Sequence, residues 1–406
     1  MIDANNLKKS WKNYQLVKKV FDLFGHKNIY FVGGAVRDFL QKKPLNDIDL
    51  VVKLDVNTVK KKLNNEAIPF LDLSKGHGTI SLISMKNSIE ITSMRIDKKT
   101  YGRKAEVEFV EDIYLDSCRR DFTVNSIYMN YNGAIYDPHK GINDLLNGRI
   151  KFIGSPVKRI KEDKLRILRY FRFLSYYGCS KSNLDKNSAN ASLKSFSLIK
   201  KISKERKSYE FFKLLMGKYA SEVLIFMIKH NVIQYILPSL QNIKTKIIKY
   251  FNNLKTEKIL RISYLLILAN FDPVNLREYL HFNKKEYLLI KNICINFKLF
   301  QVNNVKDARL AKYELGQKVG INIYYLQCFL EMKNMNKKVK NIFDEWNIPE
   351  LPINGNDLKK IGLTKGKYLG NVLKETKKWW IKKDFKPDRK QCVNKSKLIF
   401  TSSTKP

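Results

Sequence analysis

The chain has 406 residues, 44% of them hydrophobic and 12% aromatic, which is enough to build more than one folded core without disulfides. Its formal net charge is +39, from 77 Lys and Arg against 38 Asp and Glu, and this excess favours a polyanionic partner. A coding sequence biased towards lysine would give the same excess, so the charge supports RNA binding without establishing it.

The cysteines and the apolar runs bear on where the protein works. The five cysteines are scattered and form no C-x-x-C pair, which argues against a disulfide framework or a zinc site. The N-terminal sequence lacks the apolar core of a signal peptide, and no apolar run approaches the roughly 20 residues of a membrane span. We therefore expect a cytoplasmic protein without a membrane segment.

The first part of the chain predicts an α+β domain with a mixed sheet. A first strand ends at Gly33-Gly34, and residues 35–40 then have the pattern of a helix start. The expected strands are 29–32, 47–52, 79–84, 88–94 and 106–110. Beyond residue 154 strand signals almost vanish, so the second part is expected to be all helical, with a break at 348–352.

The triplet Asp47-Ile48-Asp49 lies on an expected strand. Residues two apart on a strand face the same way, so both carboxylates project from one side. Two oxygen ligands at this spacing suit Mg²⁺, and two such ions can clamp an in-line phosphoryl transfer. A solvated strand end carrying two acids would look the same, because the motif is short.

A strand, Gly33-Gly34 and a helix precede these acids. Glycine lets backbone N–H groups at a helix N-terminus approach a phosphate, and Arg37 lies one turn into the helix. An isolated pair of glycines fits an ordinary tight turn equally well. The succession of strand, glycine pair, helix and D-x-D strand favours a phosphate site beside the two acids.

Two further arginine groups attract attention. Arg119 and Arg120 precede Asp121 and an apolar run that is expected to be helical. They fit a solvated patch, or a pair in which Asp121 holds one guanidinium while the other contacts a phosphate.

In the segment 162–173, a helix would align one acid and three arginines at i+3 spacing on one stripe. That segment also fits an amphipathic helix with ordinary salt bridges, for instance from Glu162 to Arg166. The residues of the stripe are Asp163, Arg166, Arg169 and Arg172.

Taken together, these motifs resemble those of class II CCA-adding tRNA nucleotidyltransferases, in the polymerase-β-like superfamily, and of the related bacterial poly(A) polymerases. The segments appear in the order of the family, with a gap in the helical body. They are VGGAVRDFL…PLNDIDL at 32–50, GHGTISL at 76–82, IEITSMRID at 89–97, YGRKAEVEF at 101–109, RRDFTVNSIY at 119–128, YDPHKGINDLLNGRI at 136–150, EDKLRILRYFRF at 162–173 and INGNDLKKIGLTKGKYLGNVL at 353–373.

The resemblance implies a role for each matched residue. Asp47 and Asp49 would be catalytic metal ligands for Mg²⁺, with Glu90 as a possible third carboxylate. Asp163 and Arg166 would read the nucleobase. The other residues implied in nucleotide binding are Gly33, Gly34, Arg37, Arg120, Arg169 and Arg172.

The resemblance also implies the architecture and the reaction. A palm-like head would be followed by an all-α neck, body and tail, and the enzyme would add C and A to the 3′ end of tRNA from CTP and ATP, with no obligate protein partner. The expected limits are 1–152 for the head, 153–215 for the neck, 216–345 for the body, 346–385 for a tRNA-binding tail and 386–406 for a basic, disordered end.

One departure and three alternatives remain at this point. The flexible loop of the family usually contains D-G-R-H-A, whereas this chain has Tyr101-Gly102-Arg103-Lys104-Ala105. In the family this loop, with Gly102 and Arg103 at its centre here, is linked to the switch from C to A addition, so its presence argues against a CC-only enzyme. The alternatives are a poly(A) polymerase, a tRNA enzyme that adds only A, and an inactive RNA-binding paralogue.

Overall fold

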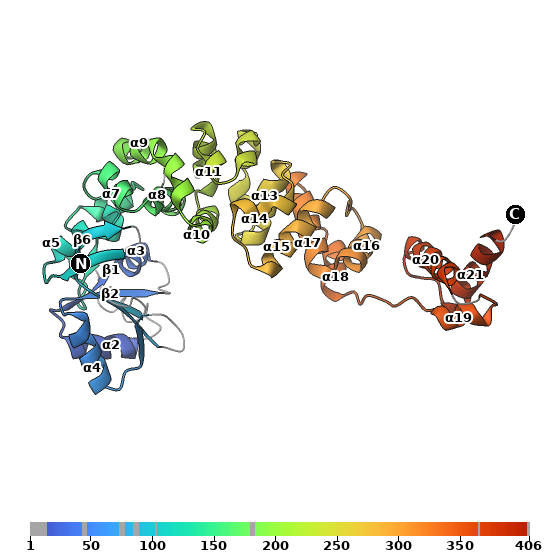
Figure 1. Ribbon diagram of the computed structural model, residues 1–406, viewed down its shortest axis with the longest axis horizontal. Coiled ribbons are helices and arrows are strands. Elements are labelled where there is room, and N and C mark those ends of the chain that lie inside the picture. Colours follow the sequence, from blue (N-terminus) through green and yellow to red (C-terminus); the bar gives the residue numbers. More distant parts are fainter. Residues whose placement is uncertain are drawn as a thin grey trace. The chain divides into compact units, whose positions relative to one another are not determined.

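The computed structural model describes residues 14–42, 47–72, 78–83, 89–101, 104–178, 183–363 and 366–403 (Figure 1). The chain divides into two compact units, which are described separately. One comprises Met1–Asn253 with Tyr279–His281, and the other comprises Leu254–Glu278 with Phe282–Pro406. The predicted limits of head, neck, body and tail do not coincide with this division, and they stay predictions.

The first unit begins with the expected α+β part. Its helices are α2 (Tyr14–Phe24), α3 (Gly34–Leu40), α4 (Val56–Asn65), α5 (Ile113–Cys118) and α6 (Gly141–Leu146). Its strands are β1 (Ile29–Val32), β2 (Ile48–Val52), β3 (Phe70–Asp72), β4 (Thr79–Leu82), β5 (Ile89–Ser93), β6 (Arg95–Tyr101), β7 (Lys104–Phe109), β8 (Tyr128–Met129) and β9 (Ile135–Tyr136). The predicted strands are confirmed in place, and their described ends are shifted by at most two residues; residues 84 and 88, which two of the predicted strands included, lie outside the described residues.

Seven strands form one sheet in the order β3-β4-β5-β2-β1-β8-β9, and β6 pairs with β7 in a separate antiparallel hairpin. The pair β2–β5 is parallel, whereas the other pairs of the sheet are antiparallel, so the predicted mixed sheet is confirmed. The central strand β2 is therefore fixed by neighbours on both sides, which gives its side chains a rigid frame.

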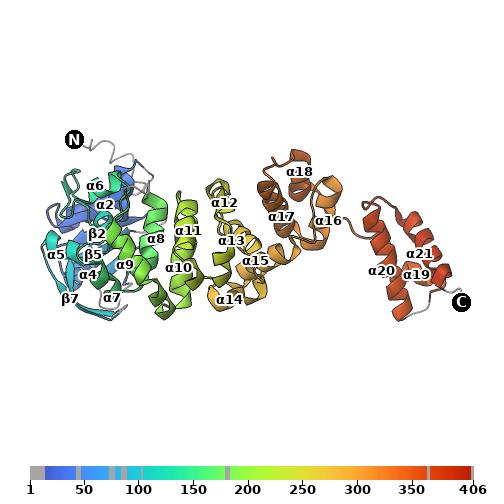
Figure 2. The same ribbon diagram turned by 90° about the horizontal axis from the view of Figure 1, so that it is seen from above.

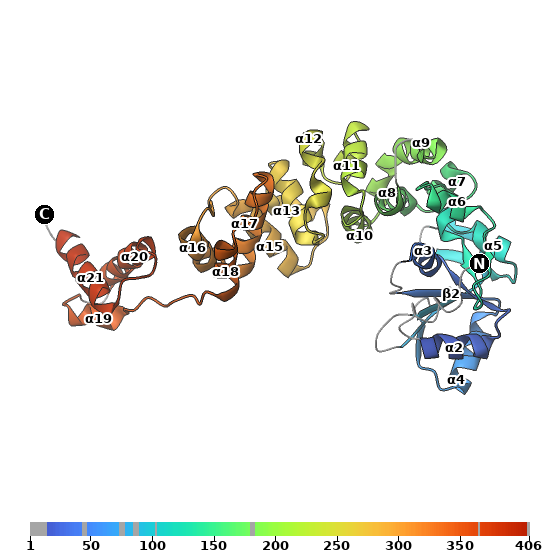
Figure 3. The same ribbon diagram turned by 180° about the vertical axis from the view of Figure 1, so that it is seen from behind.

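The two faces of β2 have different surroundings. Ile48, Leu50 and Val52 belong to a buried core that also contains side chains of α2 and α4, which lie against this face in Figures 1 and 3. Because side chains alternate along a strand, Asp49 projects from the opposite face. Val51 lies on that second face in a smaller buried cluster with Tyr128. Ile48, Leu50 and Val52, which face away from the acids, thus anchor the strand, as the sequence predicted.

Among the described residues of the first unit, helices follow the sheet and no further strand forms. They are α7 (Pro156–Glu162), α8 (Leu165–Tyr177), α9 (Lys186–Lys194), α10 (Lys204–Leu215), α11 (Ala220–Lys229) and α12 (Thr245–Ile248). The helix α8 packs beside α10 and α11 (Figure 2). Its buried residues include Ile167, Tyr170 and Phe171, so its arginines occupy the remaining face.

The second unit is also helical. Its helices are α13 (Lys258–Leu268), α15 (Lys284–Asn296), α16 (Val305–Leu315), α17 (Gln317–Leu330), α18 (Lys337–Glu345), α19 (Gly355–Lys360), α20 (Lys367–Lys382) and α21 (Arg389–Ser403), and α14 (Leu276–Tyr279) lies at the division. The all-helical second part is confirmed. Across the described ranges, no helix combines the length and the apolarity required to cross a membrane.

The predicted disorder at the C-terminal end is wrong for residues 389–403, which form α21. Cys392 is fully buried in a core shared with Trp380, and the hydroxyls of Ser396 and Thr376 are hydrogen-bonded at 2.9 Å. The small residues Cys392 and Ser396, one turn apart, thus let α21 pack closely on α20. The basic composition of the segment gave no indication of this packing.

Two local expectations are also wrong. The run after Asp121 is not a helix but a short 3-10 turn, Thr123–Asn125, followed by β8, which pairs with β1. The segment 162–173 is not one helix, because the chain is extended at Asp163 (φ −142°, ψ 113°) and α8 starts afterwards. The Asp163 carboxylate accepts the N–H of Leu165 at 3.0 Å, a local bond that competes with helix continuation.

Candidate active site

The glycine pair after β1 places the backbone next to Asp49. Gly33 has a φ of +65°, which a side chain would disfavour, and a Cβ on Gly34 would lie 3.4 Å from Asp49 Oδ2. The Gly34 N–H also bonds to the Asp49 carboxylate. The turn therefore brings the start of α3 onto the acid, whereas the sequence predicted that this N–H would face a phosphate.

Asp49 and Glu90 stand side by side, because they are register partners on the parallel strands β2 and β5. Burial raises the pKa of Asp49, Arg120 and Arg37 lower it, and the charge of Asp47 raises it again. Burial and the charges of Asp49 and Asp47 raise the pKa of Glu90. These carboxylates destabilise one another's negative charge, so the site favours an added cation.

Asp47 lies just before β2 and is exposed. Among the described residues, no group of three or more His, Cys, Asp or Glu side chains is arranged to hold a metal. Mg²⁺ needs only one or two protein carboxylates when substrate phosphates and water complete its shell. Asp47 and Asp49 therefore fit a divalent ion that binds together with a nucleoside triphosphate.

A buried carboxylate, Asp116 on α5, holds the arginine pair. Arg119 Nε lies 2.8 Å from its Oδ1, Arg120 Nη2 lies 3.1 Å from its Oδ2, and the Tyr128 hydroxyl donates to it at 2.7 Å. Burial opposes the charge of Arg120, but Asp116 and Tyr128 outweigh it and raise the pKa of this guanidinium. The sequence assigned this holding role to Asp121, and that interpretation is wrong.

Asp121 instead holds Arg169 of α8, whose Nε donates to Oδ2 at 2.6 Å, and it accepts a bond from Asn125 Nδ2 at 2.6 Å. Burial opposes the charge of Asp121, but Arg169 and Asn125 lower its pKa well below the usual range. Asn125 Oδ1 in turn accepts a hydrogen bond from Arg37. One buried acid thus connects the helix α3 with the helix α8.

Arg37 is 8% exposed, and its guanidinium lies against two aromatic rings of α8. It is 5.1 Å from the ring centre of Phe173 and 5.3 Å from that of Tyr177. Its Nε atom is buried and has no hydrogen-bond partner among the described residues. The rings fix the cation in place and leave donor capacity for a ligand.

Asp163 and Arg166 are each held by another residue. Asp163 Oδ2 accepts from Arg206 Nη2 of α10 at 2.9 Å, and Arg166 forms an ion pair with Glu162 and donates to the Arg159 carbonyl oxygen at 2.9 Å. The alternative prediction of a Glu162–Arg166 salt bridge is therefore confirmed. This salt bridge does not exclude a ligand-binding role for Arg166, because a guanidinium has five N–H donors.

The last arginine of α8, Arg172, pairs with Glu210 of α10 at 3.0 Å. Burial lowers the pKa of Arg172, as does the charge of Arg169, while Glu210 opposes this shift. Burial raises the pKa of Glu210, and the charges of Arg172 and Arg169 lower it. Since each arginine of α8 meets an acid from another element, the row is rigid before any ligand arrives.

One cavity of about 690 Å³ collects these side chains. The predicted residues that line it are Gly33, Gly34, Arg37, Asp49, Glu90, Arg120, Asp163, Arg166, Arg169 and Arg172. Asp47 does not line it, and Gly102 and Arg103 lie outside the described residues. The lining residues that the sequence reading did not assign to the site are Asp121, Asn125, Leu165, Phe173, Arg206, Tyr209, Glu210 and Lys213.

The missed residues on α10 left one signal in the sequence. Arg206 and Glu210 are spaced i, i+4 in a stretch otherwise rich in lysine, and such a pair usually forms a bridge within its own helix. Here Arg206 instead bonds to Asp163, at the junction of α7 and α8, and Glu210 pairs with Arg172 on α8. Chemically, the cavity offers acids at one end and a row of cations along α8, which suits a metal-bound polyphosphate.

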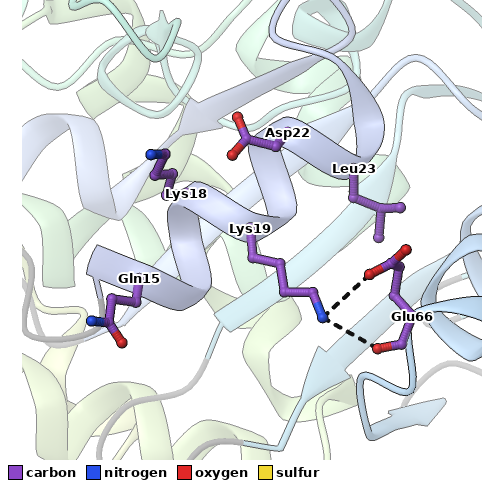
Figure 4. Close-up of a pocket in the computed structure, with 6 residues that line it drawn as sticks. All are labelled: Gln15, Lys18, Lys19, Asp22, Leu23 and Glu66. Carbon is purple, nitrogen blue, oxygen red and sulfur yellow. Dashed lines mark hydrogen bonds and ion pairs between the residues drawn. The ribbon is translucent and has the colours of Figure 1, made fainter.

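A second depression, at the surface between α2 and the end of α4, has a structural explanation (Figure 4). Lys19 Nζ lies 3.3 Å from both the backbone oxygen and the carboxylate of Glu66, the residue that ends α4. It thereby satisfies a carbonyl that the helix leaves unpaired. The arrangement ties α2 to α4 and carries no chemistry.

Family models match two parts of the chain. Residues 29–151 match the poly A polymerase head domain, and residues 183–244 match the probable RNA and SrmB-binding site of polymerase A. A CCA-adding enzyme of Anoxybacillus flavithermus is 31% identical over 82% of this chain and 83% of its own length. The human mitochondrial CCA tRNA nucleotidyltransferase 1 is 28% identical over 93% of this chain and 89% of its own length.

Solved structures show the same fold. The Bacillus stearothermophilus CCA-adding enzyme in complex with CTP superposes with a TM-score of 0.76 over 95% of this chain and 98% of that chain, at 21% identity. The Thermotoga maritima CCA-adding enzyme complexed with tRNA superposes with a TM-score of 0.65 over 98% of each chain, at 18% identity. The α+β head with a helical remainder is thus a known architecture.

Proposed function

Because the chain belongs to the family of CCA-adding tRNA nucleotidyltransferases, we propose that it adds C and A to the 3′ end of tRNA from CTP and ATP, without a template. The observation that carries this proposal is the single cavity that joins Asp49 and Glu90 to Asp163 and Arg166. The 3′ end of the tRNA and a nucleotide whose base is read by Asp163 and Arg166 would meet there. Solved relatives hold CTP, ATP or tRNA, which agrees with these substrates.

Nucleotidyltransferases of this family use a divalent metal ion, and we propose Mg²⁺ held by Asp47 and Asp49, with Glu90 beside them. When bound, the ion supplies charge neutralisation for the attacking and leaving oxygens of the in-line displacement. Burial first, and then the charge of a neighbouring carboxylate, raises the pKa values of Asp49 and Glu90, and a cation bound here would offset both effects.

The protein's own cations would bind the triphosphate. Arg120, Arg169 and Arg172 are held by Asp116, Asp121 and Glu210 respectively, so their positions are set before the nucleotide enters. Preorganised charges cost little reorganisation when negative charge shifts to the leaving pyrophosphate.

Base choice would depend on Asp163 and Arg166. Cytosine and adenine present an exocyclic amino donor where uracil and guanine present a carbonyl acceptor, so a carboxylate accepts from the first pair and repels the second. Arg166 would donate to the neighbouring ring nitrogen. The two residues lie together in the cavity, as this role requires.

The test is extension of three acceptors with each labelled NTP supplied singly. We expect C addition to tRNA lacking CCA, A addition to tRNA ending in CC, and neither on a generic oligonucleotide. Adenylation of the generic RNA would identify a poly(A) polymerase, and A addition without C addition would identify an A-only enzyme. No extension of any acceptor would identify an inactive paralogue. The basic second unit and a family that acts on tRNA favour the first outcome.

The tRNA body would bind the helices α20 and α21, whose exposed lysines include Lys382, Lys390 and Lys397. Changing these three to glutamine is expected to reduce the slope of log affinity against log salt by about 2 to 3, at roughly 0.9 per phosphate contact on a duplex. The Michaelis constant for tRNA should rise while that for CTP stays constant. An unchanged slope in filter-binding titrations from low to moderate salt would remove these lysines from the interface.

We propose the cytoplasm as the place of this reaction, although the vertebrate relatives are named as mitochondrial. Both compartments hold tRNA and nucleoside triphosphates. Fluorescence of a C-terminally tagged chain in its own cells distinguishes them.

A further inference from the structure

The carboxylate of Asp163 is held from two sides. Oδ1 accepts the backbone N–H of Leu165 at 3.0 Å, and Oδ2 accepts Arg206 Nη2 at 2.9 Å. The two side chains are 24% and 22% exposed, and both line the cavity. Because Asp163 lies at a break between two helices, no regular helix geometry fixes its side chain, and these two bonds set its direction.

Arg206 itself is well anchored. It lies in the first turn of α10, where the Ser203 hydroxyl caps the helix by accepting the Arg206 N–H at 3.5 Å. One turn later Glu210, which is 2% exposed, pairs with Arg172 at 3.0 Å. Buried Phe211 and Leu214 fix the same helix in the core. The helix α10 thus makes two ion pairs: Arg206 holds Asp163, just before α8, and Glu210 holds Arg172 on α8.

The bonds to Leu165 and Arg206 do not saturate Asp163. A carboxylate has about four acceptor sites, of which these bonds occupy two, so each oxygen keeps one site for a ligand. Because Asp163 lines the cavity, a ligand bound there can reach these remaining acceptor sites.

We infer that Arg206 is a positioning residue for nucleobase choice, an inference that rests on the proposed reading of the base by Asp163. Arg206 does not touch the reacting atoms. It holds the carboxylate where the amino group of cytosine or adenine donates to it, and where the carbonyl of uracil or guanine meets repulsion. Without it, Asp163 keeps only the local bond to Leu165 and turns about its side-chain bonds.

The experiment compares the specificity constants for CTP, UTP, ATP and GTP on tRNA lacking CCA and on tRNA ending in CC. Arg206→Met keeps the length of the side chain and removes the charge. We expect it to lower discrimination of CTP over UTP, and of ATP over GTP, by about 10-fold, within the roughly 5- to 150-fold that one base-reading pair is worth. Arg206→Lys restores a charged donor and should recover part of this discrimination.

The matched control is Lys207→Met, which removes the same charge from the next position of α10, and Lys207 does not line the cavity. It should leave the ratios unchanged. If Arg206→Met lowers all four constants equally, Arg206 is only structural and the inference is wrong. If the methionine variant does not fold, Arg206→Gln, which keeps a donor without charge, decides between the same two outcomes.

A further arm separates this inference from the proposed function. If Asp163→Asn changes the ratios and the Arg206 variants do not, the base is read by Asp163 and the inference about Arg206 fails alone. If neither change affects the ratios while the wild-type protein still adds C and A, the base is read elsewhere. If the wild-type protein adds neither nucleotide to tRNA, the proposed function fails.

Discussion

Replacing Asp49 by asparagine is expected to lower the rate of nucleotide addition by roughly 10³-fold, because several kcal/mol of charge stabilisation in phosphoryl transfer comes from the ion that this carboxylate would hold. Asp49 lies between the glycine turn, Glu90 and Arg120, and these neighbours fix its position in the site. Asparagine has nearly the same size, so tRNA affinity should change little.

The measurement is single-turnover incorporation of labelled CTP, with tRNA affinity determined in parallel by filter binding. The matched control is Asp22→Asn, the same change at an exposed position of α2. It is expected to behave as the wild type. A rate for Asp49→Asn within about tenfold of the wild-type rate would show that the essential carboxylates lie elsewhere.

Replacing Asp116 by asparagine is expected to destabilise the first unit by about 3–5 kcal/mol. It leaves two guanidinium groups, on side chains that are only 16% and 15% exposed, without their counter-charge. Asp116 is 0% exposed and contacts Arg119, Arg120 and the Tyr128 hydroxyl. Because Arg120 also lines the cavity, addition should fall even at temperatures where the variant stays folded.

The effect should also depend on pH. Burial alone would raise the pKa of Asp116, but the charges of Arg120 and Arg119 and the bond from Tyr128 lower it to about 2. A carboxyl whose pKa is lowered by folding stabilises the protein above its unfolded pKa of about 3.9, and this contribution is lost as the pH falls towards 2. The difference between wild type and variant should therefore be full at neutral pH and shrink between about pH 4 and pH 2.

Urea unfolding followed by circular dichroism measures this difference, since three of the four tryptophans, Trp346, Trp379 and Trp380, lie in the second unit and their fluorescence does not report on the first. Asp112→Asn, at the N-terminus of the same helix, is the matched control, because asparagine caps a helix as well as aspartate does. Equal stabilities of Asp116→Asn and wild type at neutral pH would contradict the assigned role of Asp116.

The sequence by itself determined the features that rest on local periodicity. The alternation Ile48, Asp49, Leu50 predicted which side of the strand is buried, and Gly33-Gly34 predicted the turn before α3. The same reasoning failed where a side chain bonds locally, because the carboxylate of Asp163 ends one helix and the next starts at Leu165. Periodicity reports on which residues are buried, and it contains no information about such bonds.

Only the tertiary structure decided the long-range pairs of acids and arginines. Asp121 was considered as the partner of one guanidinium of the pair Arg119 and Arg120, but it meets Arg169, 48 positions away, and Asp163 meets Arg206, 43 positions away. An ion pair needs only proximity in space, and any of several acids in this charged chain satisfies the sequence pattern equally well. Packing of α8 against α10 and of the sheet against α5 selects the pairs, and so sets the geometry of the site.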